Sequence, residues 1–199
     1  MATGSGSEGR GSVFEFGVRQ IVIAGILGAI AIFLGATRLG FIPVPNLSGN
    51  ATIMHVPAIL GGALEGPIVG LITGAIFGVF SFIQAEVPFF RDPLVSILPR
   101  LPIGVVAWAV FASLRNWNLY VASIAAGVLG SFTNTVGVLG MAVLLGYLPL
   151  AAVVPIVPQA IAEAILAAIV TVVVVRGVML YRSGRTTAPE TRSDEERRY

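Results

Sequence analysis

The stretch NATIMHVPAILGGALEGPIVGLITGAIFGVFSF, residues 50–82, decides how the chain is organised. It is almost wholly apolar, yet it contains the only histidine of the chain, His55. It also carries a proline inside an apolar run, Pro57, and a Glu-Gly-Pro interruption at residues 65–67. These residues stand where an uninterrupted membrane helix could otherwise have run, so the chain must be built differently here.

Two helices in a tight hairpin account for the interruption. A helix over residues 53–64 rises only about 18 Å, which is too short to cross the hydrocarbon core of a bilayer. Pro57 and Pro67 suit the first turns of two helices, because the N–H that proline lacks is not needed there. The stretch therefore predicts a short helix over residues 53–64, followed by a longer one over residues 67–83.

Composition places the protein in a membrane. Of its 199 residues, 56% are hydrophobic and 11% are charged, and the mean hydropathy is +0.92. In a soluble domain roughly a quarter of all residues are charged, so this chain has too few charged residues to cover a water-facing surface. The absence of cysteine excludes disulfides and thiolate chemistry. The net charge of +2 comes from the ends of the chain and predicts no nucleic-acid surface.

The apolar runs predict an all-α integral membrane protein with six transmembrane helices in one domain, residues 19–181. A polar N-terminal tail, residues 1–18, precedes this domain, and a disordered polar tail, residues 182–199, follows it. The six predicted helices cover residues 20–37, 53–64, 67–83, 97–114, 119–145 and 151–178.

Arginine placement predicts the orientation of the bundle. With six spans, one side of the membrane receives most of the arginines, and that side is expected to be cytoplasmic, with both termini on it. The other side has Arg38 and Arg91, and it carries two longer loops over residues 38–52 and 84–96. The arginines on the cytoplasmic side are Arg10, Arg19, Arg115, Arg176, Arg182 and Arg185.

Polar residues inside the last two predicted helices are candidates for ligand binding, because such residues are costly in a membrane. Glu163 follows Gln159 by four residues and therefore shares its helix face. Asn134 lies mid-helix in GSFTNTVG and offers both a donor and an acceptor. The alternative interpretation is structural, with each residue hydrogen-bonded to a neighbouring helix.

Arg100 begins the fourth predicted helix in LPRLP. It either snorkels toward the membrane surface or binds a carboxylate or phosphate that enters from outside. Trp108, two turns further along, would form an aromatic wall beside that ligand or, alternatively, an anchor at the membrane interface.

Further candidates lie near the two outer loops. Phe77, Phe80, Ser81 and Gln84 form a helical stripe that suits packing as well as a pocket. His55 has no second histidine or carboxylate pair nearby, so no metal site is expected. A hydrogen bond from His55 to the outer loop or to a ligand is the more plausible role.

Small residues recur at four-residue spacing in the first helix, and they permit close helix packing. Either an internal helix contact or a separate partner protein would use them. The pairs are Ala24 with Gly28, Gly25 with Ala29, and Ala31 with Gly35. Elsewhere the chain contains no HExxH, GxSxG or P-loop motif, so no catalytic residue is expected, and the chain cannot hydrolyse ATP itself.

Three runs together resemble a known family. They are ATIMHVPAILGGALEGPIVGLITGAIFGVFSF, DPLVSILPRLPIGVVAW and SFTNTVGVLGMAVLLGYLP, and the likeness covers about residues 18–180. The chain is similar to the substrate-binding S components of energy-coupling factor (ECF) vitamin transporters. The resemblance implies a six-helix fold in a prokaryotic cell membrane that binds one vitamin-sized molecule near the outer face. It also implies a transmembrane coupling protein and two cytoplasmic ATPases as partners, and outer loops that close over the substrate.

The resemblance extends to particular positions. It implies that the coupling protein contacts Ala24, Gly28 and Ala31, and no cofactor is expected. The residues expected to contact the substrate are Asn50, His55, Gln84, Arg100, Trp108, Asn134, Gln159 and Glu163.

The substrate is the least determined part of this interpretation. The sequence is most similar to the subgroup that holds pantothenate, pyridoxine-type and folate S components, and Arg100 favours pantothenate because it suits a carboxylate. Two other classes remain open. One is a small secondary transporter in which Glu163 carries a proton, and the other is a ligand-free assembly subunit in which the polar residues only join helices. A membrane-embedded enzyme ranks last.

Overall fold

The computed structural model of the chain describes residues 17–42 and 51–186. Within these residues, five apolar segments are long enough to cross a membrane, and a sixth apolar helix is shorter. This confirms the prediction of an all-α membrane bundle with one short helix. The main helices are α1 (Val18–Ala36), α2 (Val56–Glu65), α3 (Pro67–Gln84), α5 (Pro102–Leu114), α6 (Leu119–Leu144) and α7 (Val157–Thr186).

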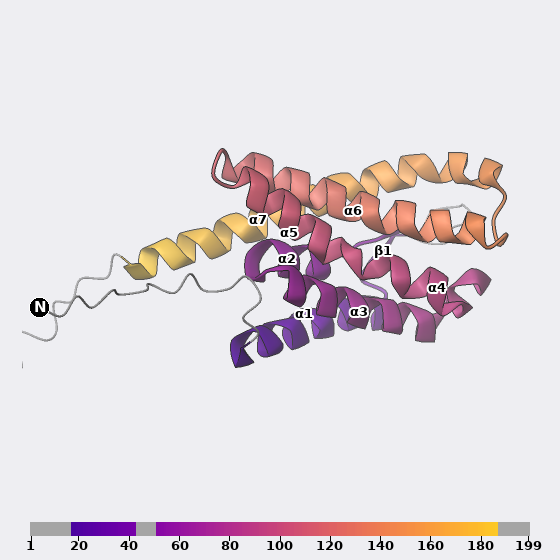
Figure 1. Ribbon diagram of the computed structural model, residues 1–199, viewed down its shortest axis with the longest axis horizontal. Helices are drawn as coiled ribbons and strands as arrows, with labels where there is room; N and C mark the ends of the chain where they lie inside the picture. Colours follow the sequence, from indigo (N-terminus) through magenta and orange to yellow (C-terminus); the bar gives the residue numbers. More distant parts are fainter. Residues whose placement is uncertain (1–16, 43–50, 187–199) are drawn as a thin grey trace, which may run out of the picture.

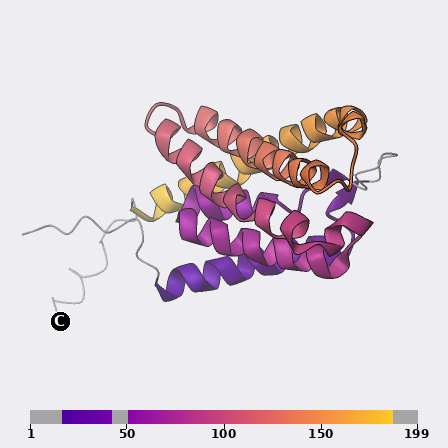
Figure 2. The same ribbon diagram turned by 45° about the vertical axis from the view of Figure 1, so that its right-hand side comes forward.

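The helices form two groups that share α5. Helices α1, α2 and α3 pack together on one side, and α6 packs against α7 on the other. Helix α5 contacts α2 and α3 as well as α6, and it therefore joins the two groups (Figures 1 and 2). The buried face of α5, with Ile103, Ala107 and Phe111, contributes to the main hydrophobic core.

The hairpin of α2 and α3 has the predicted form. Helix α3 begins at Pro67, and Gly66 turns the chain with φ +109°, which side-chain-bearing residues rarely adopt. Beyond the turn, Gly62, Gly70 and Gly104 let three helices meet backbone to backbone. A Cβ atom on Gly62 would lie 1.9 Å from the Gly104 carbonyl oxygen, so only glycine fits this crossing.

The segment before α5 differs from the prediction. A polar loop and then one helix from Ile97 were expected, but the chain makes three short turns before α5 begins. They are η1 (Pro88–Arg91), α4 (Pro93–Ser96) and η2 (Leu98–Arg100). The physical reason is proline: one lies in the first turn of each segment, where the N–H it lacks is not needed, and no helix runs through.

The last helix also departs from its predicted bounds. The 3₁₀ segment η3 (Leu150–Ile156) occupies the first turns of the predicted helix, because Pro155 lies within it and Pro158 lies in the first turn of α7. At the other end, α7 continues to Thr186 rather than ending near Val178, because no proline interrupts it and Arg182 hydrogen-bonds to Glu65 of α2. Residues 182–186, which were predicted to belong to the disordered tail, are therefore helical. Residues 187–199 lie outside the described range.

A small antiparallel ribbon, which the sequence did not predict, joins α1 to α2. Strand β1 (Phe41–Ile42) pairs with β2 (Ala51–Thr52), with Phe41 opposite Thr52. The Ile53 N–H donates to the Gly40 carbonyl at 3.0 Å and extends the pairing by one bond. Two-residue strands give too little periodicity to recognise in sequence.

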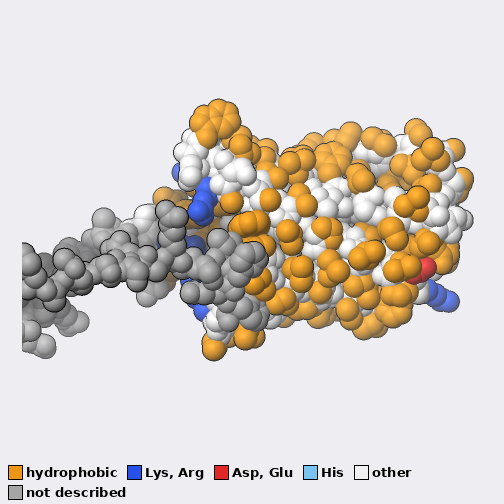
Figure 3. Space-filling view, viewed as in Figure 1, with side chains coloured by type: hydrophobic (Ala, Val, Ile, Leu, Met, Phe, Trp, Pro, Cys, Tyr) orange, Lys and Arg blue, Asp and Glu red, His pale blue; other side chains and the backbone are white. Residues whose placement is uncertain are grey.

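Charged side chains gather at the two ends of the bundle (Figure 3). Arg19 of α1 and Arg182 of α7 both contact the Glu65 carboxylate at the α2–α3 corner, at 2.9 and 2.5 Å. Figure 3 shows mainly apolar side chains along the length of the bundle, with arginine atoms gathered toward its ends. A band of apolar surface between charged ends is the pattern of a protein that crosses a bilayer.

Candidate functional site

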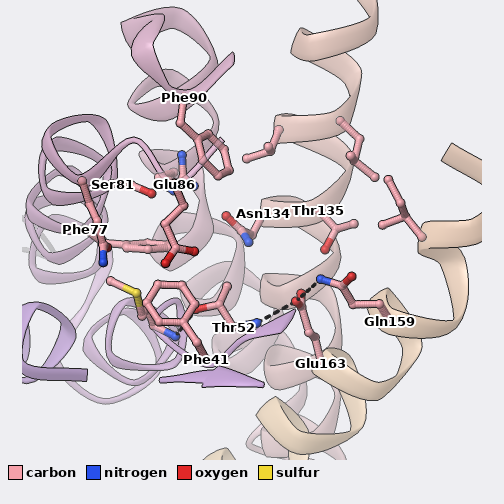
Figure 4. Close-up of a pocket in the computed structure, with 16 residues that line it drawn as sticks. Phe41, Thr52, Phe77, Ser81, Glu86, Phe90, Asn134, Thr135, Gln159 and Glu163 are labelled. Carbon is pink, nitrogen blue, oxygen red and sulfur yellow. Dashed lines mark hydrogen bonds between the residues drawn. The ribbon is translucent and has the colours of Figure 1, made fainter. Parts of the chain in front are cut away.

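A cavity opens at the end of the bundle opposite Glu65, between the α3 side and the α6–α7 side. It encloses about 640 Å³ of empty space, its open mouth included. Its walls come from the ribbon, α3, η1, η2, α6 and α7, and Figure 4 shows polar groups from opposite walls facing the same space.

Arg100 is a buried cation in this wall. Its side chain is 3% exposed, and the guanidinium lies between two aromatic rings, with Cζ 4.7 Å from the Phe77 centroid and 4.8 Å from that of Phe90. Nη1 donates to the Val95 and Ser96 carbonyls at the end of α4, whereas Nε has no hydrogen-bond partner. Arg100 forms no ion pair with any acidic residue that the structure describes. It therefore does not snorkel, and its charge has no counterion among the residues that the structure describes.

Glu163 lies on α7, where it lines the same cavity. Its Oε1 accepts a hydrogen bond from the Thr52 backbone N–H at 2.8 Å and another from Gln159 Nε2 at 3.0 Å (Figure 4). Within the described chain no hydrogen bond reaches Oε2. The predicted pairing of Gln159 and Glu163 on one face is confirmed, and the carboxylate additionally holds the ribbon.

Asn134 of α6 supplies a hydrogen-bond acceptor to the same cavity. Its side chain is 6% exposed and lines the cavity beside Thr135, and its Oδ1 has no hydrogen-bond partner in the described structure. Helix α6 comes this close because Gly130 and Gly137 have no side chains; a Cβ at Gly137 would lie 2.7 Å from the Pro99 side chain. A buried carbonyl without a donor costs free energy unless a ligand or a water satisfies it.

The predicted stripe on α3 divides between two environments. Phe77, Ser81 and Gln84 line the cavity, and Gln84 Nε2 also donates to the Gly35 carbonyl of α1 at 3.4 Å. Phe80 instead packs toward α1, where a Cβ at Gly35 would meet its ring. Three of the four residues are thus pocket residues and one is a packing residue.

Two other predicted substrate contacts are not brought to the cavity, and a third lies outside the described residues. His55 was expected near the cavity mouth, but it is fully buried at the start of α2, and neither ring nitrogen has a described hydrogen-bond partner. Trp108 is half-buried on a face of α5 that does not reach the cavity, and Phe77 and Phe90 provide the aromatic wall instead. Asn50 lies outside the described residues.

The predicted partner surface on α1 also requires correction. Ala24, Gly28 and Ala31 are buried within the chain, because this face of α1 packs against α2 and α3; a Cβ at Gly28 would lie 2.5 Å from Ile76. These residues make the internal helix contact that the spacing allowed. The pair Gly25 and Ala29 is exposed, and open space surrounds Gly25.

Sequence reasoning missed several residues of the cavity wall. Phe41, Thr52 and Met54 reach it because the ribbon folds back toward α7, and no sequence signal indicated the ribbon. Glu86 and Phe90 lie in the second outer loop, which was recognised as a loop over the substrate, but its individual residues were not assigned. In the described ranges, no three His, Asp or Glu side chains lie close enough together to hold a metal ion.

Comparison with known proteins gives one positive result. A family model described as "ECF transporter, substrate-specific component" matches residues 19–175. A search of curated proteins finds no match.

Proposed function

Since the chain belongs to the substrate-specific components of ECF transporters, we propose that it captures a carboxylate-bearing vitamin, with pantothenate favoured, for uptake. The family establishes the coarser statement: the protein is a multi-pass membrane subunit of a prokaryotic importer that binds substrate and is not an enzyme. The identity of the substrate rests on the cavity.

Arg100 is the single observation that supports a carboxylate most strongly. A buried cation without a counterion is costly, and an anion entering the cavity would offset that cost. The guanidinium is held by two carbonyls and two rings, so it is positioned before the ligand arrives. Its Nε–H has no hydrogen-bond partner among the described residues, so a carboxylate oxygen that reached it would satisfy an otherwise unpaired donor.

The rest of the wall suits a ligand that carries hydrogen-bond donors. Glu163 Oε2 and Asn134 Oδ1 are acceptors without described donors. Pantothenate has one carboxylate, one amide and two hydroxyl groups, so its acidic end matches Arg100 and its donors match the two acceptors. A ligand without donors would leave these oxygens unsatisfied.

Uptake in this proposal requires a transmembrane coupling protein and two cytoplasmic ATPases. The arginine-rich end, with Arg19, Arg115, Arg176 and Arg182, would face the cytoplasm together with both termini. The cavity lies at the other end and would then open to the outside, where the vitamin is captured. The assembly proposal thus agrees with the direction of import.

The exposed pair Gly25 and Ala29 is the proposed contact with the coupling protein, in place of the buried stripe. Small residues at this spacing let a second helix approach closely. The double change Gly25→Leu with Ala29→Leu should reduce recovery of the coupling protein in a pull-down while the affinity for vitamin stays unchanged. Val173→Phe, on an exposed site of α7, is the control. Assembly at the level of the unchanged protein would remove these residues from the interface.

Native mass spectrometry of the detergent-purified full chain tests the proposed substrate class. We expect one small molecule per chain, and extraction should identify it as a carboxylate-bearing vitamin. A protein that retains nothing, and that gains no thermal stability from any of a panel of vitamins, would contradict the proposal. Uptake by the chain without ATPases, driven by a proton gradient, would instead support the secondary transporter.

A further inference from the structure

The ribbon β1–β2 forms part of the cavity wall, and its own strand pairing is short. Phe41 and Thr52 line the cavity, yet each strand has only two residues. A short two-stranded hairpin is at best marginally stable on its own. The position of this wall therefore depends on what the ribbon contacts outside itself.

One side chain of α7 provides a hydrogen-bonded attachment. The Thr52 N–H, a backbone donor that needs a partner, donates to Glu163 Oε1 at 2.8 Å. Gln159 Nε2 donates to the same oxygen at 3.0 Å and fixes the carboxylate on α7. Thr52 and Glu163 are 111 positions apart in the chain, so this bond closes the cavity between its first and last helical groups.

The same carboxylate has a second oxygen for the ligand. Both described bonds go to Oε1, and Glu163 lines the cavity, so Oε2 is available to a donor from within it. A hydroxyl that donates to Oε2 would stabilise the carboxylate in its present rotamer, which is the rotamer that holds Thr52. By linkage, a ribbon held in place must in turn strengthen ligand binding by the same factor.

We propose that Glu163 is a positioning residue that couples ligand binding to the placement of the ribbon: one oxygen holds Thr52 and the other accepts a hydroxyl of the ligand. This inference rests on the proposed function, because it requires the ligand to bind in this cavity. It adds a second requirement for recognition. The ligand must present a donor to α7 as well as a carboxylate to Arg100.

Hydrogen exchange followed by mass spectrometry tests the coupling in the full-length protein in detergent. The amides of residues 51–54 are followed with and without saturating pantothenate. Without ligand, the amides of residues 51–54 should exchange faster in Glu163→Ala than in the unchanged protein. With pantothenate, exchange in the unchanged protein should slow by about 5- to 150-fold, the usual range of coupling between two sites. Glu163→Ala should lose this slowing, and Glu163→Gln should keep part of it, because an amide oxygen still accepts the Thr52 N–H.

Glu65→Gln is the matched control. Glu65 is also a buried, doubly hydrogen-bonded carboxylate, but it lies at the far end of the bundle. Its change should leave exchange at residues 51–54 unaltered, which separates coupling from general loss of stability.

Two results would overturn the coupling while leaving the proposed function intact. One is pantothenate binding with no slowing at residues 51–54, and the other is equal slowing in the unchanged protein and Glu163→Ala. A failure of the unchanged protein to bind pantothenate would overturn the proposed substrate, and with it the ligand half of the coupling. In that case, exchange without ligand still tests whether Glu163 holds the ribbon. Equal rates in the unchanged protein and in Glu163→Ala would show that Glu163 does not hold Thr52.

Discussion

Two glutamates at opposite ends of the bundle are buried to a similar extent but have different partners. The Glu65 side chain, 9% exposed, is paired with Arg19 and Arg182 and ties the ends of α1 and α7 to the α2–α3 corner. Glu163 is 7% exposed and has no described ion pair; it accepts from a backbone N–H and an amide, and one oxygen remains open to the cavity. Burial therefore does not distinguish these two glutamates, whereas the oxygen of Glu163 that faces the cavity without a described donor does.

The surroundings of the two ends show the same contrast. At the Glu65 end, Gly62, Gly70 and Gly104 bring three helices together without space between them. At the cavity end, proline-started turns replace a continuous helix, and no described acidic residue forms an ion pair with Arg100. One end is closed by packing and ion pairs, and the other retains unmet charge and hydrogen bonds that a ligand would complete.

Removing Arg100 should have the largest effect on ligand binding. Arg100→Ala is expected to weaken pantothenate binding by about 2–5 kcal/mol, because it removes the buried partner of the carboxylate. Isothermal titration calorimetry measures this. Arg91→Ala, an exposed arginine at the same end, should bind like the unchanged protein.

Arg100 also holds the Val95 and Ser96 carbonyls, so the thermal unfolding of each ligand-free variant is measured in parallel. Arg100→Lys keeps the charge and should show intermediate affinity, because a lysine cannot offer two parallel donors. Undiminished affinity in Arg100→Ala would place the ligand carboxylate elsewhere.

Filling the closed end should have the next largest effect, on stability rather than on binding. Gly62→Ala introduces an atom 1.9 Å from the Gly104 carbonyl oxygen and should destabilise the fold by about 1–3 kcal/mol. The midpoint of thermal unfolding should fall accordingly. Gly140→Ala, where nothing lies within 4 Å, should be neutral or stabilising by up to about 1 kcal/mol. Equal behaviour of the two variants would contradict the close crossing.

Removing the charge of Glu65 should have a smaller effect. Its arginine partners are 64% and 43% exposed, so solvent screens both pairs. Glu65→Gln should lower the free energy of unfolding by about 1 kcal/mol, less at high salt, without changing pantothenate affinity. A marked loss of affinity would mean that the two ends are not independent.

The smallest effect on stability should come from removing a side-chain hydrogen bond of the loop between α6 and η3. The Tyr147 hydroxyl donates to Asp92 Oδ2 at 3.0 Å, and this bond, together with the Asp92 charge, raises the pKa of Tyr147 above its ordinary value. A raised pKa favours the protonated folded state, so the contribution is complete below the ordinary tyrosine pKa, about 10, and is lost as the pH rises above it. Tyr147→Phe should remove this high-pH step from a stability profile. A step that persists would assign it to another tyrosine.

Much of this architecture could be predicted from the sequence because it depends on local signals. Composition predicted the membrane bundle, and Pro67 and the Glu-Gly-Pro corner predicted the start of α3. Gln159 with Glu163, and Asn134 within its polar run, identified two parts of the cavity wall. Helical spacing also paired Ala24 with Gly28 and Ala31 with Gly35, although it did not show which helix they face.

The remaining features depend on distant contacts that one sequence does not reveal. Thr52 enters the site only because a ribbon of two-residue strands reaches α7. His55 and Trp108 were misplaced because packing decides which face of a helix points to the cavity. This holds for the short helix α2, which follows His55, and for α5, which carries Trp108 and begins after the proline-started turns. The turn from η2 to α5 likewise decides which aromatic rings surround Arg100.

The most direct test of the central claim compares two ligands in one calorimetric experiment on the unchanged protein. Pantothenate and panthenol are each titrated into the protein. Panthenol has a hydroxymethyl group in place of the carboxylate, and it keeps the amide and the other hydroxyls. We predict that panthenol binds at least about 30-fold more weakly, a difference of about 2 kcal/mol, and that the difference disappears in Arg100→Ala. Equal affinity for both ligands, or binding of neither, would contradict capture of a carboxylate by Arg100.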